Sequence, residues 1–148
     1  MTRAPGASAV VLLAALALTG CSGDPQEDYC ESVTEHQEEL TEIAASEDSG
    51  ALFDALDTYD DLREHAPRDI ADDWDAVIDP LRRLEDVLAH HDVDASSYTA
   101  DEPPADLDDA ARQEIEAAAR EVGSERTVTA MAAVEQHALD VCGTPLSR

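Results

Sequence analysis

Apolar residues recur every three or four positions along most of the chain after residue 26, which is the spacing of one face of an α-helix. The first stripe predicts a helix over residues 27–45, and the second predicts a helix over residues 50–65. These two stripes consist of Tyr29, Val33, His36, Leu40, Ile43, Leu52, Phe53, Leu56, Tyr59 and Leu62. No segment has the alternation of apolar and polar residues that is typical of a strand, so we expect an all-α protein.

A third stripe runs from Ile70 to Leu88 and keeps its spacing across Pro80. Proline inside a helix removes a backbone hydrogen bond, so we expect a kink, or a stop and restart, without a reversal of direction. Residues 92–104 follow, and their Ser, Asp and Pro content predicts a linker.

Two further stripes predict a fourth helix over about residues 106–122, opened by Asp106 as its cap, and a fifth helix after Gly123-Ser124. Gly143 and Pro145 are expected to end the fold. The predicted fold class is therefore a compact all-α bundle of about five helices, forming one acidic domain over residues 27–148.

Residues 1–20 have the organisation of an export signal, with a positively charged start and an uncharged apolar run over residues 8–18. That run is shorter than the roughly 20 residues that a membrane-spanning helix needs. The following Leu18-Thr19-Gly20-Cys21 resembles the lipobox of bacterial lipoproteins. The resemblance implies cleavage before Cys21, a lipid on that cysteine, and a lipidated tether over residues 21–26. The alternative is an ordinary secretory signal with an incidental cysteine.

With Cys21 lipidated, Cys30 and Cys142 remain as a pair in an oxidising compartment. We therefore predict a disulfide between the first and last helices. Catalytic or metal-bound cysteines are the alternative, but no Cys-x-x-Cys or Cys-His spacing supports them. Because five helices in alternating directions would put the two cysteines at opposite ends, we expect the third and fourth helices to be parallel, with linker 92–104 crossing the bundle.

The charge of the chain is strongly negative, with 35 acidic and nine basic residues and a net charge of −26. Loss of Arg3 with the signal would bring the net charge to −27, and every basic residue is an arginine. Such a surface repels nucleic acids and anionic lipid headgroups, so we expect no nucleic-acid partner. A solvated exterior explains the charge most simply, and an acidic face for cations is the alternative.

His36 is a polar residue on an otherwise apolar stripe. A half-buried histidine with one satisfied hydrogen bond is the common explanation, and ligand contact is the alternative. A pocket lined by His36 and Tyr59 would favour a small ligand, so these two residues are the candidates for ligand contact.

Metal and catalytic motifs are incomplete in this sequence. Asp92, Asp94 and Ser96 match the opening of a calcium-binding loop, but Ser97 stands where the loop needs Gly, and Pro103 where it needs Glu. The chain has no nucleophile elbow, no Gly-rich phosphate loop and no zinc-binding spacing. We therefore expect no enzyme, no cofactor and no dedicated metal site.

The mature chain as a whole resembles an uncharacterised family of small lipoproteins from actinobacteria. The resemblance covers nearly the entire mature domain and implies a shared helical fold and an extracytoplasmic location, but it supplies no catalytic residues. The residues that carry it are Asp28-Tyr29-Cys30-Glu31, Glu35-His36-Gln37, Ala66-Pro67-Arg68-Asp69-Ile70, Trp74, Tyr98, Pro103-Pro104 and the segment from Asp140 to Leu146.

These features predict a non-catalytic lipoprotein on the extracytoplasmic face of the cell membrane, held there by lipid on Cys21. We expect it to bind an envelope protein or a cell-wall partner. The alternative is a low-affinity cation- or small-solute-binding lipoprotein that uses the acidic surface or a pocket near His36.

Overall fold

A computed structural model describes residues 24–46, 50–99 and 104–148, and within these ranges the chain is helical, with no strand. The expected signal, the expected lipidation site Cys21 and the first half of the expected tether, residues 21–23, lie outside the described residues. The elements are α1 (Pro25–Ala45), α2 (Ala51–Asp54), α3 (Leu56–His65), α4 (Ala71–His90), the 3-10 turn η1 (Ala95–Ser97), α5 (Asp109–Val122), α6 (Glu125–His137) and the π-helical turn η2 (Ala138–Cys142).

The expected all-α fold is confirmed, but the count of five helices is wrong. Four helices of the described chain are long, namely α1, α4, α5 and α6, and the single helix expected over residues 50–65 is divided into the short α2 and α3 by a turn at Ala55. Gly50 permits a close approach between this segment and η1, because a Cβ there would lie 2.6 Å from the Ser96 backbone. Helix α2 accordingly contacts η1.

Local sequence accounts for the starts of α1, α5 and α6. Asp24 caps α1 by accepting a hydrogen bond from the Gln26 amide, so the helix begins at Pro25, two residues earlier than expected. Asp108 caps α5 in the same way, which corrects the cap expected at Asp106. Helix α4 continues through Pro80 without a break, so the direction is kept as expected but the alternative of a stop and restart is wrong.

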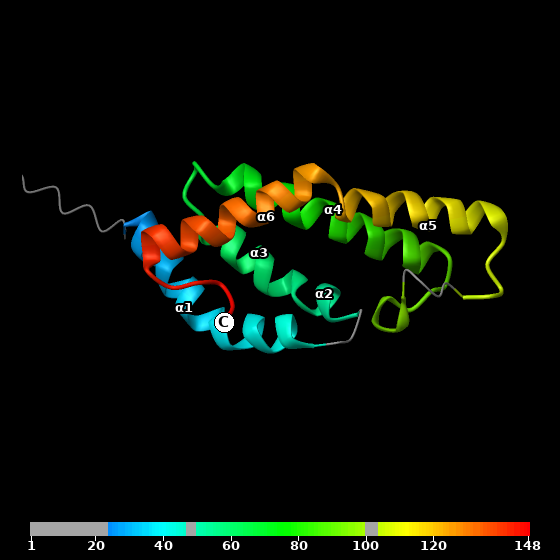
Figure 1. The fold of residues 1–148 in the computed structure, drawn as a ribbon, viewed down its shortest axis with the longest axis horizontal. Helices are drawn as coiled ribbons and strands as arrows, with labels where there is room; N and C mark the ends of the chain where they lie inside the picture. The colour runs from blue at the N-terminus through cyan, green and yellow to red at the C-terminus, as the bar shows by residue number, and fades with distance from the viewer. Residues whose placement is uncertain (1–23, 47–49, 100–103) are drawn as a thin grey trace, which may run out of the picture.

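The expected parallel arrangement of the third and fourth predicted helices, which correspond to α4 and α5, is wrong. Figure 1 shows α5 returning antiparallel along α4, with α6 following α5 in nearly the same direction. Ser124 caps α6 directly after Gly123 ends α5, so the two helices share one short turn. Because α5 and α6 run in series, the end of η2 reaches the start of α1 without a crossing linker.

The core consists of two clusters that meet along α4. The larger cluster joins α1, α3, α6 and the N-terminal half of α4 around the fully buried Trp74. The smaller cluster joins Leu84 and Leu88 of α4 to Ile115 of α5 and to Tyr98 beyond η1. This division places the two ends of the described chain on the larger cluster.

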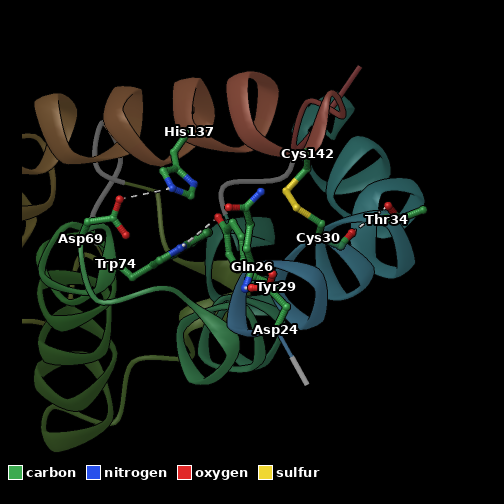
Figure 2. Close-up of a disulfide and its surroundings, with 9 residues drawn as sticks. All are labelled: Asp24, Gln26, Tyr29, Cys30, Thr34, Asp69, Trp74, His137 and Cys142. Atoms are coloured by element: carbon green, nitrogen blue, oxygen red, sulfur yellow. Dashed lines mark hydrogen bonds and ion pairs between the residues drawn. A yellow bond between two sulfur atoms is a disulfide. The ribbon is translucent and has the colours of Figure 1, made fainter. Parts of the chain in front are cut away.

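The predicted disulfide is confirmed between Cys30 in the second turn of α1 and Cys142 at the end of η2, with the two Cα atoms 5.2 Å apart (Figure 2). It closes a loop in which the cysteines are 112 positions apart. In the chain-entropy model, a loop of about 100 residues contributes roughly 4.7 kcal/mol.

Replacing both Cys30 and Cys142 by Ser should lower the free energy of unfolding by about 2–5 kcal/mol, because the unfolded chain regains the entropy of the open loop. Denaturant unfolding measures the loss. Reduction of the wild-type protein should produce a similar loss and leave the double variant unchanged. Two free thiols at these positions in the exported, unreduced protein would contradict the pairing.

A cavity beneath the C-terminal segment

A partly open apolar cavity of about 330 Å³ lies where α1, α2, α3, α6 and the C-terminal segment, residues 143–148, meet. Leu40 from α1 and Leu146 from the C-terminal segment are almost fully buried beside it. Leu52 of α2 also lines it and keeps half of its surface exposed. The volume lies at the lower end of the range for small-molecule sites, about 300–1,000 Å³.

Residues 143–148 form one wall of this cavity, although Gly143 and Pro145 were expected to end the fold. Gly143 adopts a left-handed conformation, with φ of 66°, and this turns the chain back along α1. The Gln37 amide then donates to the Pro145 carbonyl at 2.6 Å, and the Arg148 backbone N–H donates to the Thr41 hydroxyl at 3.1 Å. These bonds hold Leu146 against the core.

Tyr59 and Glu135, from two different helices, are among the polar residues that line the cavity. Tyr59 of α3 is 7% exposed, and its ring lies 5.6 Å from the Trp74 ring between centroids. Glu135 of α6 is exposed to solvent. Burial, and then the negative charge of Glu135, raise the pKa of the Tyr59 phenol above its usual value. The phenol is therefore neutral at physiological pH.

A second hollow, more open and of about 470 Å³, shares Glu135, Leu146 and Ser147 with the cavity. Leu139 of η2 lines it and is 48% exposed. The C-terminal segment thus borders both the cavity and this hollow.

His36 does not line the cavity, so the structure does not bring it together with Tyr59 in one pocket. Its Nε2 lies 3.0 Å from Asp61 Oδ2, and its Nδ1 lies 3.4 Å from Glu39 Oε2. The histidine is therefore half-buried and hydrogen-bonded across α1 and α3. Ligand contact by His36 stays a prediction.

Hydrogen-bonding side chains from α1 and α3 contact Asp61. The Ser32 hydroxyl donates to Asp61 Oδ2 at 2.9 Å, next to His36, and His65 Nδ1 lies 2.8 Å from the Asp61 carbonyl oxygen. The Ser32 hydrogen bond lowers the pKa of the Asp61 carboxyl, and the carbonyl contact raises the pKa of His65. Serine and histidine both bind the carboxylate here, whereas a nucleophilic relay needs serine bonded to histidine.

His137 lies near the disulfide in Figure 2, between Asp69 and Tyr29. Its Nε2 is 3.8 Å from Asp69, and its ring meets the Tyr29 ring edge-on at 5.6 Å. Its buried Nδ1 has no hydrogen-bond partner within the described ranges. Trp74 donates to the Tyr29 hydroxyl at 3.3 Å, so this region is a polar part of the core.

The incomplete calcium-loop motif has a local structural role. The Asp94 carboxylate accepts hydrogen bonds from the Ser96 amide and hydroxyl, and so caps η1. Among the residues that the structure describes, no group of three or more His, Cys, Asp or Glu side chains is placed to hold a metal ion.

Sequence reasoning missed Glu135, Leu146 and Met131 as cavity residues. Met131 lies on the apolar stripe of its helix with Val128 and Val134, and Glu135 resembles any other acid of an acidic chain. Leu146 offered one signal, because it is an apolar residue placed after the cysteine that closes the fold.

Comparisons with known proteins found no matching family model, no matching curated protein and no matching solved structure. None of the helices in the described part of the chain is both long enough and apolar enough to cross a membrane.

Ser32→Ala should raise the pKa of Asp61, because the hydroxyl is the first cause of its lowering. The Asp61 contribution to stability is present above its unfolded pKa, near pH 4, and is lost as the pH falls through the folded pKa. The free energy of unfolding of the variant should therefore be about 1 kcal/mol lower than that of the wild type at pH 7, and the difference should be smaller below pH 3.

Carboxyl NMR titration and denaturant unfolding measure these two effects. Thr34→Ala is the matched control, because Thr34 is exposed on the same helix and its hydroxyl donates only to the Cys30 carbonyl. An Asp61 pKa that does not change in Ser32→Ala would contradict the assignment.

Proposed function

We propose that the protein is a lipid-anchored, extracytoplasmic, non-catalytic binding domain whose ligand enters the cavity beneath the C-terminal segment. The observation that carries the binding function is this apolar cavity of about 330 Å³, which is lined by Leu40, Tyr59 and Leu146 and open to solvent beside Leu52. Apolar cavities with a few polar groups are the usual sites of small ligands.

The lipobox-like Leu18-Thr19-Gly20-Cys21 supports the anchor, and the Cys30–Cys142 disulfide is consistent with an oxidising compartment. The resemblance to actinobacterial lipoproteins points to the same location. Two or three acyl chains on Cys21 would hold the domain stably, since each buried methylene contributes about 0.8 kcal/mol.

The position of the cavity favours a ligand from the cell envelope over one from the anchoring membrane. Leu40 lies roughly 22 Å along α1 from Pro25, at 1.5 Å per residue. The proposed tether precedes Pro25, so the cavity lies away from the anchored end of this helix. A small solute, or an apolar side chain of an envelope partner, would reach it from that side.

Cys21→Ala should abolish incorporation of an alkyne-labelled palmitate analogue and move the protein from the membrane fraction to the soluble fraction. The physical reason is the loss of the thioether-linked lipid. The double Cys30→Ser, Cys142→Ser variant is the control and should still be labelled. Equal labelling of wild type and Cys21→Ala would contradict the anchor.

An apolar probe should bind in the cavity and change the fluorescence of Trp74, the single tryptophan, because its ring packs against Tyr59. Titration with 1-hexanol should give a saturable change in the wild type. Ala44→Phe should weaken binding at least fivefold, because Ala44 lines the cavity and the added ring occupies it.

Ala45→Phe is the matched control, because Ala45 is also exposed near the end of α1 but does not line the cavity. It should leave binding unchanged. Equal weakening by the two substitutions, or no saturable change in the wild type, would refute the cavity as a binding site.

A further inference from the structure

The polar groups of the cavity are not balanced by cations. Its walls are mainly Leu, Ile, Ala and Met side chains, and its polar side chains are those of Tyr59, Glu135, Ser46 and Ser147. Within residues 24–46, 50–99 and 104–148, Glu135 has no ion pair within 4.0 Å, and no hydrogen bond of the Tyr59 hydroxyl is found. A carboxylate and a buried phenol therefore border an apolar space.

The surroundings offer Glu135 little positive charge. The chain has no lysine. Arg63 is paired with Asp75 and Arg82 with Asp60, both away from the residues that line the cavity. Arg148 follows the cavity residue Ser147 but forms no ion pair with Glu135. The negative potential at the cavity mouth is thus left for a ligand to neutralise.

We propose that the cavity binds a primary alkylammonium group, with its hydrocarbon chain among Leu40, Met131 and Leu146 and its ammonium at Glu135. This inference rests on the proposed binding function and specifies the chemical class of the ligand. The ammonium donates three hydrogen bonds, which the Glu135 carboxylate and the Tyr59 hydroxyl oxygen can accept.

The same geometry disfavours other ligand classes. A divalent metal ion needs several oxygen ligands, and the cavity provides one carboxylate. An alkyl carboxylate of the same length would place its negative charge beside Glu135. A neutral alcohol fills the apolar space equally well but gains no charge-assisted hydrogen bond.

The test compares n-hexylammonium, 1-hexanol and hexanoate on the full-length protein by Trp74 fluorescence at constant ionic strength. Hexylammonium should bind about tenfold more tightly than hexanol, which corresponds to one charge-assisted contact, and hexanoate should bind more weakly than hexanol. Glu135→Gln should bring the affinity for hexylammonium to within twofold of the affinity for hexanol.

Glu125→Gln is the matched control, because Glu125 is exposed on the same helix, carries the same charge and does not line this cavity. It should preserve the tenfold preference. Equal binding of hexylammonium and hexanol to the wild type, or equal effects of the two Gln variants, would overturn the ammonium site while leaving the binding function intact. Failure of all three probes to bind would refute the proposed binding function itself.

Discussion

The disulfide between Cys30 and Cys142 is the constraint on which the rest of the structure depends, because it joins the start of α1 to the last helical turn. The chain between them must leave one end of the molecule and come back to it. The return path is the series of α5 and α6, which runs antiparallel to α4 (Figure 1). Beyond Cys142, the left-handed Gly143 directs the C-terminal segment back along α1, and this segment forms a wall of the cavity.

Helix positions could be predicted from sequence because each depends on residues within one or two turns. The stripe through Trp74, Leu81 and Leu88 is buried along one face of α4, and the helix keeps its direction across Pro80 without the restart that proline suggested. The direction taken after Gly123-Ser124 could not be predicted in this way. A glycine end followed by a serine cap fits a reversal or a continuation equally well, and the choice depends on the face of α4 that both helices must cover.

The cavity was less predictable than the fold for the same reason. Its lining residues come from four helices and the C-terminal segment, so no pattern within a single stretch of sequence could predict it. Tyr59 was identified from its place on a stripe, but its assumed neighbour His36 lies against Asp61 instead. Residues three or four apart share one face of a helix. The rotation of the helix about its axis determines which of them faces the core and which faces a polar neighbour. Only the packing of α1 on α3 fixes that rotation.

The net negative charge of the whole protein and the single carboxylate of the cavity act over different distances. Charge across the whole surface attracts any cation, and this attraction decays over a Debye length of about 8 Å at physiological ionic strength. Glu135 is exposed but lies beside apolar walls, so a ligand with both an ammonium group and a hydrocarbon chain could contact the carboxylate and the walls at once. The general field can therefore concentrate cations near the protein, whereas selection of a cation with a hydrocarbon chain requires the apolar walls and the carboxylate together. An exposed acid elsewhere on α6 has the same charge but lacks those walls, and so it cannot distinguish an alkylammonium from a simple salt cation.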